Sequence, residues 1–138
     1  MTFTSDADLF DLTCRFLELR LPKSEWTHEA HFGVALCLLA DAHHNAFAEM
    51  PDLIRAYNTA TGVENNDHEG YHETITLASL QVARSYLSDA PLHEALNALM
   101  RSKYGTSRWM LDHWSKDRLF SVEARKTWCP PDLKPLPL

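Results

Sequence analysis

The first regular pattern of apolar positions lies between residues 8 and 20. Apolar side chains recur there at spacings of three and four residues, at Leu9, Leu12, Phe16 and Leu19. This spacing is typical of one face of an α-helix, so we predict an amphipathic helix with that face in a core. The helix should end at Leu21-Pro22, because a residue that precedes proline is driven out of helical geometry.

The most apolar segment follows and predicts a central, buried helix. Ser24 offers an N-cap oxygen and Glu25 a carboxylate in the first turn, so this helix should begin near Trp26. It then continues through the sequence HFGVALCLLA, which is apolar nearly all round. A helix that is apolar on every face is expected in the interior of a domain.

The rest of the chain predicts further helices and no strands. A third helix should run from Ala46 or Met50 to about Thr59, with Pro51 tolerated only in its first turn. The segment TGVENND is a polar turn, in which Gly62 can adopt a positive φ. Later helices are predicted from after Asp67 to about Ser88, over Leu92 to Lys103, from Ser107 to Trp114, and around Val122 to Trp128.

These patterns together predict one all-α domain over residues 1–138, a bundle of five or six helices. The length of 138 residues is enough for a hydrophobic core without disulfide or metal staples. Residues 129–138 hold four of the seven prolines and should be extended. We expect Leu133, Leu136 and Leu138 to lie along the bundle, so that this tail forms a strap packed on it.

Composition narrows the class of partner. The formal net charge of −6 disfavours general nucleic-acid binding, because neutralising phosphates requires a basic face. No apolar run approaches the roughly 18 residues that span a bilayer, and the first residues lack a secretory-signal pattern. Cys14, Cys37 and Cys129 form no CxxC pair, so we expect free thiols, a cytoplasmic protein and no membrane partner. A homo-oligomer is compatible with the sequence.

The charges are unevenly distributed along the chain. Residues 1–90 carry 5 basic and 14 acidic side chains, whereas residues 91–138 carry 8 basic and 5 acidic ones. The basic excess, which includes Arg101, Lys103 and Arg108, has two readings. It is either a solvated surface that pairs with the acidic half or a rim that binds an anion.

Three histidines at the starts of buried helical segments give the strongest indication of chemistry. His28 and His31 are three residues apart, so their Cβ atoms should lie roughly 5–6 Å apart on one helix face. His72 should begin the inward face of the helix after Asp67. If consecutive helices alternate up and down, the two helices that carry these histidines begin at the same end of the bundle. The three imidazoles would then meet in one enclosed place.

Such a cluster predicts a transition-metal site, with zinc, iron or manganese as the ion. Three protein ligands would leave one position for a water molecule, which becomes a nucleophile near neutral pH. Glu73, beside His72, is the candidate for a further ligand or a general base. The motif HEAH is not the HExxH of zinc proteases, since only two residues separate its histidines.

Other polar residues are expected at the same end of the bundle. Tyr57, Asn58 and Tyr71 would orient a substrate there. Arg84 would either pair with a carboxylate or bind an acidic group of the ligand, and the sequence leaves both roles open. His113, which follows Asp112 between two tryptophans, is interpreted as a structural residue rather than part of a second site.

Three stretches, WTHEAH, GYHETIT and LFSVEARKTWCPPDLKPL, resemble stretches found in the same order in a family of small, uncharacterised bacterial proteins. The resemblance covers the chain from about Leu17 to Leu136. It implies no particular activity, because no established reaction comes with that family. The positions that it highlights are Trp26, Thr27, His28, His31, Tyr71, His72, Glu73, Thr74, Glu123, Arg125, Asp132 and Leu133.

The leading hypothesis is therefore a small helical metal-binding protein, extended to a metal-dependent enzyme that acts on a small polar metabolite. The first alternative is a metal-free module, in which the histidines and Arg84 hold a polar or anionic small molecule in a pocket walled by tryptophan and tyrosine. The second alternative is a structural or partner-binding protein whose proline-rich tail docks a partner.

Overall fold

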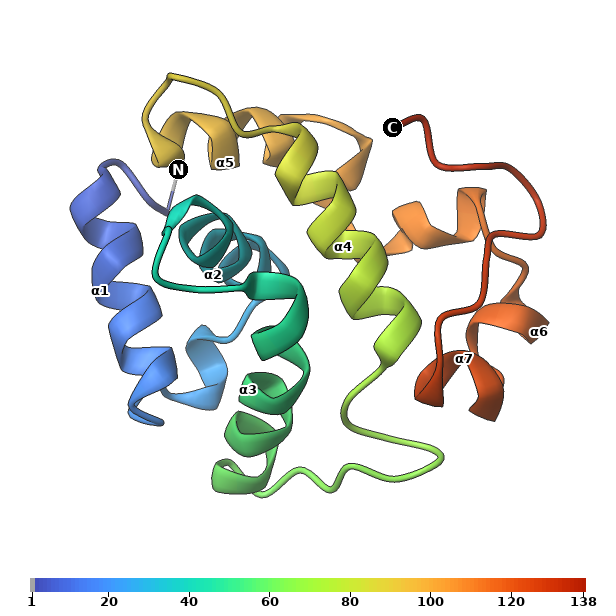
Figure 1. Cartoon of the computed structure of the whole chain (residues 1–138). Helices are drawn as coiled ribbons and strands as arrows, with labels where there is room; N and C mark the ends of the chain where they lie inside the picture. The colour runs from blue at the N-terminus through green and yellow to red at the C-terminus, as the bar shows by residue number, and fades with distance from the viewer. Residues whose placement is uncertain (1) are drawn as a thin grey trace.

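Helices account for all the regular secondary structure of residues 2–138, which are the residues that the computed structural model describes (Figure 1). The longer helices are α1 (Asp6–Leu17), α2 (His28–Ala40), α3 (Ala46–Ala60), α4 (Glu73–Ser85) and α5 (Leu92–Arg101). The shorter ones are the 3₁₀ turns η1 (Lys23–Glu25), η2 (Lys103–Gly105) and η3 (Ser107–Asp112), then α6 (Lys116–Leu119) and α7 (Val122–Lys126). The predicted all-α fold class is confirmed.

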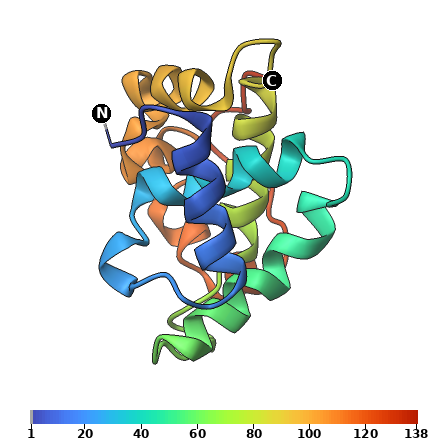
Figure 2. The same ribbon diagram turned by 90° about the vertical axis from the view of Figure 1, so that its left-hand side faces the viewer.

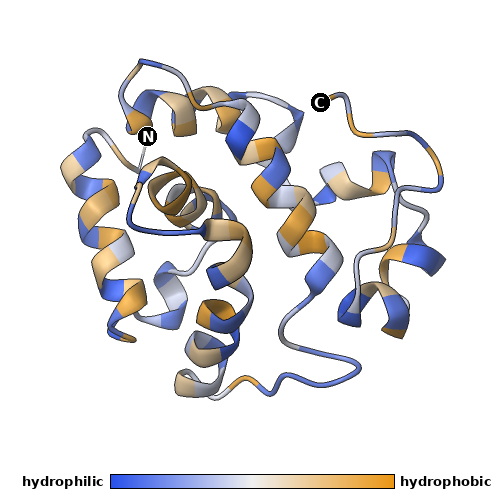
Figure 3. Ribbon diagram, viewed as in Figure 1, coloured by the Kyte–Doolittle hydropathy of each residue, from blue (hydrophilic) through white to orange (hydrophobic). Residues whose placement is uncertain are grey.

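α2 lies at the centre of the molecule, as its sequence predicts. Figure 1 views this helix nearly end-on, with α1, α3, α4 and α5 around it. Apolar residues occur on every side of it in Figure 3, and Phe32 to Leu38 form an unbroken buried run. Placing such a helix inside the other four removes the largest amount of apolar surface from water, which is the main driving force of folding.

The helices do not alternate up and down as parallel neighbours. In Figure 1, α2 points along the view while α1, α3 and α4 lie across it, and Figure 2 shows α2 passing behind α1 and crossing it. Gly33 lies at this crossing, because a Cβ atom there would stand 3.1 Å from Leu9 Cδ2 and 3.3 Å from Leu12 Cδ2. The expected alternation is therefore wrong. Apolar spacing defines which face is buried, but not the angle at which two helices cross.

α2 begins later than its sequence suggested. Its N-cap is Thr27, whose hydroxyl accepts a hydrogen bond from the backbone N–H of Ala30 at 3.1 Å. Ser24, the expected cap, lies instead in the separate turn η1, which has no side-chain cap. The consequence for the site is that His28 occupies the first position of α2, where its ring projects from the helix end toward neighbouring segments.

α3 takes the earlier of its two expected starts. Asn45 caps it by accepting a hydrogen bond from the backbone N–H of Ala48, so Pro51 falls beyond the first turn of the helix. This placement contradicts the expectation that Pro51 is tolerated only in the first turn. The missing N–H removes one intrahelical hydrogen bond, and the strong Asn45 cap fixes the helix start regardless. After the helix, Gly62 has the expected positive φ, 83°.

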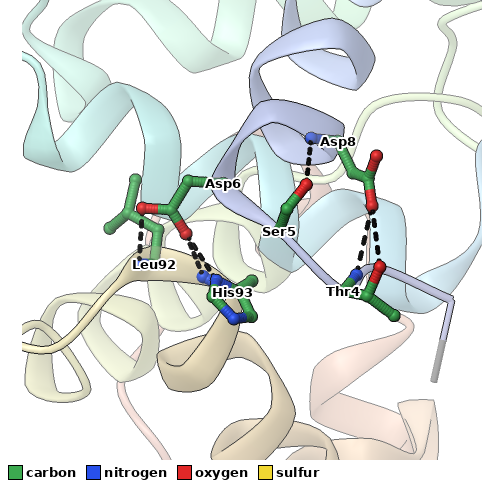
Figure 4. Close-up of polar contacts among 6 residues, drawn as sticks. All are labelled: Thr4, Ser5, Asp6, Asp8, Leu92 and His93. Atoms are coloured by element: carbon green, nitrogen blue, oxygen red, sulfur yellow. Dashed lines mark hydrogen bonds and ion pairs between the residues drawn. The ribbon is translucent and has the colours of Figure 1, made fainter.

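α5 is held at its first turn by Asp6, a residue from the beginning of the chain (Figure 4). The Asp6 carboxylate accepts hydrogen bonds from the backbone N–H groups of Leu92 at 3.1 Å and His93 at 2.8 Å. It also lies 2.7 Å from His93 Nδ1. Burial alone would raise the pKa of Asp6, but these hydrogen bonds outweigh burial and the pKa is lowered. The contact joins the first and fifth helices through hydrogen bonds from α5 to the Asp6 carboxylate.

The segment after residue 128 is anchored by hydrogen bonds to the last turns. The indole Nε1–H of Trp114 donates to Cys129 O at 2.8 Å. His113 is fully buried, and its Nδ1 donates to Lys134 O at 2.9 Å. Its Nε2 accepts from Lys103 Nζ at 2.9 Å. His113 is thus a structural residue, as interpreted from the sequence.

The leucines of this tail are less buried than the predicted strap requires. Leu136 packs against the core, whereas Leu133 is 60% exposed and Leu138 is 57% exposed. The strap is therefore held by the backbone and by polar side chains rather than by three leucines. An extended, proline-rich chain has about three residues per turn, so its side chains point in different directions and only some of its apolar groups can face the surface beneath it.

Candidate functional site

A pocket of about 320 Å³ opens between α2, α3, α4 and residues 107–120. Its apolar lining consists of Phe32, Ala35, Met50, Ile54, Ile75, Leu80, Trp109, Met110, Leu111, Leu119 and Phe120. Its polar lining consists of His28, His31, Thr76, Ser79, Ser107 and Arg108. A concave, mainly apolar cavity with a few polar groups is the usual form of a small-molecule site.

His28 lines this pocket but one of its nitrogens is already occupied. Its Nε2 lies 2.7 Å from the backbone oxygen of Tyr104. A carbonyl oxygen only accepts hydrogen bonds, so Nε2 must carry the proton and donate. The ring also packs edge-on against Phe32, with 5.2 Å between ring centroids. His28 therefore links the start of α2 to η2 and forms a fixed part of the pocket wall.

His31 is the unoccupied imidazole of the pocket. Its ring stacks on Trp26 with 3.8 Å between centroids, and no atom of residues 2–138 forms a hydrogen bond with either ring nitrogen. The side chain is exposed and faces the pocket. Desolvation by the surrounding protein atoms, together with the nearby His28, lowers the pKa of His31 to about 4. The ring is neutral near pH 7 and offers one donor and one acceptor.

His72 does not line the pocket and both of its ring nitrogens are occupied. It is the N-cap of α4, where Nδ1 accepts a hydrogen bond from the backbone N–H of Ile75 at 3.1 Å. Its Nε2 donates to Leu119 O at 2.7 Å. Burial is the main reason why the pKa of His72 is lowered. His72 begins α4 as its N-cap and is buried, as expected for the start of the inward face, but its ring is directed toward Leu119 O and not into the pocket.

The structure does not bring His28, His31 and His72 together as metal ligands. Within the described part of the chain, no group of three or more histidine, cysteine, aspartate or glutamate side chains is placed to hold a metal ion. Two of the three rings are instead bonded to backbone carbonyl groups. The crossing of α2 over its neighbours explains this result, since the alternation that would have aligned the helix starts does not occur. A zinc, iron or manganese centre stays a prediction of the sequence.

Glu73 and Tyr71 interact with each other and do not line the pocket. The hydroxyl of Tyr71 donates to the Glu73 carboxylate, and the guanidinium of Arg55 lies 4.3 Å from the centroid of the Tyr71 ring. Burial is the largest cause of the raised pKa of Tyr71, and the bond to Glu73 adds to it. In this arrangement Glu73 holds the loop before α4 and has no access to the pocket as a base.

Tyr57 and Asn58 also hold the fold together. Tyr57 is buried and donates its hydroxyl hydrogen to Leu21 O at 2.8 Å, which fixes the turn that follows α1. Asn58, in α3, donates through Nδ2 to Oδ1 of Asn65 at 3.0 Å, which joins the helix to the loop that follows it. Neither side chain lines the pocket, so the structure gives neither one a place beside a ligand there.

Arg84 lies in the last turn of α4, away from the start of that helix. Its guanidinium stands 4.8 Å from the centroid of the Phe47 ring on α3, which is a cation–π contact. The pocket lining does not include it. Its expected role toward a ligand is therefore not supported by the geometry, and the contact with Phe47 accounts for its position.

Some pocket residues were not singled out in the sequence. Ser79 interrupts the inward face of α4, and a hydroxyl on an otherwise apolar stripe is a signal of a polar contact or a cavity. Arg108 belongs to the group of basic residues after residue 90, for which anion binding was one of two interpretations. Its position in the pocket wall agrees with that interpretation. Trp109 is one of the tryptophans expected in the core or in a pocket wall, whereas Met110 carries no sequence signal of a pocket, because its contribution depends on how η3 packs.

Comparisons with known proteins return no family model, no curated protein and no solved structure that matches this chain. The resemblance of WTHEAH and GYHETIT to a family of small bacterial proteins therefore stays a prediction. Among the residues described, no helix is both long enough and apolar enough to cross a membrane.

Proposed function

We propose that this chain is a metal-free small-molecule binding module whose ligand has a largely apolar body. The pocket between α2, α3 and α4 is the observation that carries the proposal. Its volume of about 320 Å³ lies at the lower end of the range of ligand cavities, roughly 300–1,000 Å³. Three of its walls come from α2, α3 and α4, and a cavity that is already formed loses little ordering entropy on binding.

His31 supplies the specific polar contact in this proposal. Its two ring nitrogens are free of protein partners, and stacking on Trp26 fixes the plane of the ring. A ligand that covers these nitrogens without forming a hydrogen bond to them would remove their water partners and lose affinity. The preferred ligand therefore combines an apolar body with at least one group that can hydrogen-bond to a neutral imidazole.

The proposal places this module in the cytoplasm. Cys14, Cys37 and Cys129 are free thiols, and free thiols persist in reducing compartments. Cys37 is an inert thiol rather than a nucleophile, because burial raises its pKa to about 11 and the thiolate is the reactive form. The proposed function therefore involves binding without a covalent step at this residue.

Titration with the neutral fluorescent probe N-phenyl-1-naphthylamine tests the proposal. We expect one saturable site with a dissociation constant of about 0.1 mM or below. Ser79→Phe should fill the pocket and abolish binding, whereas Ser85→Phe, on the exposed side of the same helix, should leave it intact. Thermal unfolding of both variants checks that they fold. No saturable binding by the unmodified chain, or equal binding by the two variants, would contradict the proposal.

The metal hypothesis is tested separately on the same preparation. Protein purified without an affinity tag or chelator should contain only substoichiometric zinc, iron and manganese by elemental analysis. Probe binding should also survive a strong chelator. A stoichiometric transition metal that disappears in both His28→Ala and His31→Ala would instead support the metal-binding hypothesis, because loss of a ligand lowers metal affinity.

A further inference from the structure

The charge of the pocket wall differs from that of the whole chain. The chain carries 19 acidic and 13 basic side chains, yet the pocket lining contains no carboxylate. Arg108 supplies the one permanent formal charge of the described lining, because the other polar residues in it are histidine, serine and threonine. A ligand in this pocket therefore meets a positive potential at one point and no negative side chain.

Arg108 is available to a ligand. No carboxylate among residues 2–138 forms an ion pair with its guanidinium, in contrast to Arg15, which is held by Asp11 at 3.0 Å and Glu25 at 3.1 Å. Arg108 is exposed, so the charge stays hydrated until a ligand arrives. An arginine of this kind can bind a carboxylate through two parallel hydrogen bonds without first breaking an internal pair.

The inner part of the pocket favours an uncharged apolar body. Phe32, Ile54 and Leu80 form part of this wall, and a charged group placed among such side chains would lose its hydration without a compensating partner. The hydroxyls of Thr76 and Ser79 supply weaker polar contacts. An amine would find no acidic partner anywhere in the lining. The arrangement thus separates an apolar interior from a cationic rim.

We propose that the ligand of this pocket is a monocarboxylic acid with a compact apolar body, whose carboxylate binds Arg108 at the rim while the body fills the interior. This inference rests on the proposed binding function and specifies its ligand class. The volume of about 320 Å³ fits one or two fused rings or a short alkyl chain, and it is too small for a dinucleotide. Arg108 acts here as the specificity-determining residue for acids over neutral analogues.

Three molecules of the same shape test the inference by isothermal titration calorimetry. They are 2-naphthoic acid, its neutral analogue 2-naphthamide and the cationic 2-naphthylmethylamine. We expect the acid to bind most tightly and the amine most weakly. Arg108→Gln should weaken the acid about fivefold, the effect of one solvent-exposed charge pair of about 1 kcal/mol, and should leave the amide unchanged. Arg101→Gln is the matched control, because Arg101 is exposed, forms no ion pair among the described residues and does not line the pocket.

The outcomes separate the inference from the proposed function. If the amide binds as tightly as the acid, or if Arg108→Gln and Arg101→Gln weaken the acid equally, the acid specificity is wrong while the binding function stands. If none of the three molecules binds, or if Ser79→Phe leaves their binding unchanged, the pocket is not the binding site and both proposals fail. Raising the salt concentration should weaken only the acid, since an exposed ion pair is screened.

Discussion

His72 stabilises the fold in only one protonation state. Nδ1 must keep its lone pair to accept the hydrogen bond from Ile75 N–H, while Nε2 carries the proton that it donates to Leu119 O. A protonated ring has no lone pair left, so the cap of α4 would be lost. The imidazole therefore performs the task that serine or aspartate performs at other helix starts.

Substitution of His72 tests this capping role. Asparagine can also accept a hydrogen bond from the third residue of a helix, whereas alanine cannot. We expect His72→Ala to lower the free energy of unfolding by about 1 kcal/mol more than His72→Asn does. Urea unfolding of the two variants at neutral pH measures the difference. Equal losses would show that the bond to Ile75 contributes nothing.

The same residue makes stability depend on pH. Burial lowers the pKa of His72 in the folded chain below its ordinary value of 6.5, so the unfolded chain takes up a proton more readily than the folded one. The stability that the neutral ring contributes is present above pH 6.5 and is lost as the pH falls below that value. His31, with a pKa lowered to about 4, acts in the same direction.

We therefore expect the free energy of unfolding to fall between about pH 7.5 and pH 5, and to fall less steeply in His72→Asn. The variant keeps His31, so the difference between the two slopes reports His72. Urea unfolding at a series of pH values provides this comparison. If the two slopes coincide, the folded pKa of His72 is not lowered.

At the scale of elements, the loop between α3 and α4 depends on two glycines with the same backbone angle. Gly62 and Gly70 both have φ of 83°, a region that other residues enter at a cost of roughly 1–2 kcal/mol. Their surroundings differ. A Cβ atom at Gly62 would meet no atom within 4 Å, whereas one at Gly70 would stand 2.2 Å from the backbone oxygen of Glu64.

This pair separates backbone strain from steric clash. Gly62→Ala should cost only the conformational term, roughly 1–2 kcal/mol. Gly70→Ala should cost clearly more, about 3 kcal/mol or above, because the backbone of Glu64 must also move. Chemical denaturation of both variants gives the comparison. If Gly70→Ala lowers the free energy of unfolding no more than Gly62→Ala does, the backbone of Glu64 moves aside without an energetic cost and the predicted clash is absent.

The helices were largely predictable from the sequence, and the position of α4 shows where prediction fails. Apolar residues at spacings of three and four located α1, α3 and α5, and the apolar run located α2. The sequence predicted that α4 begins after Asp67, but the helix begins later. The residues in between form a polar loop, whose backbone is held by tertiary contacts such as the hydrogen bond from Arg125 to Gly70 O at 3.0 Å. Histidine is also an uncommon N-cap, so nothing local marked His72 as the boundary.

The pocket itself could not be predicted, for a reason that concerns packing between elements. A helix such as α2, apolar on every face, carries no information about which neighbour covers which face. The crossing of α2 over α1 depends on a close approach at Gly33, and that crossing directs His31 into the pocket while His72 lies elsewhere. Spacing correctly placed His28 and His31 on one helix, but their relation to His72 required the three-dimensional arrangement.

At the scale of the whole molecule, residues 129–138 are part of the fold. Without them, the Trp114 indole would lose its acceptor at Cys129 O and the His113 ring would lose Lys134 O. Both side chains are fully buried, and a buried donor left without a partner costs about 1–3 kcal/mol. The free energy of unfolding of a chain that ends at Trp128 should therefore be lower by about 2–6 kcal/mol in total.

A chain that ends at Pro135 is the matched control for this truncation. It keeps both acceptor oxygens and loses only the half-buried Leu136, the exposed Leu138 and the proline between them, so its stability should change by about 1 kcal/mol or less. Urea unfolding of the two truncated chains and the full chain provides the test. The contrary outcome is that the chain that ends at Trp128 keeps its stability and loses only the binding of another protein. The tail would then be a docking segment, as in the partner-binding hypothesis, and its contacts with Trp114 and His113 would not stabilise the fold.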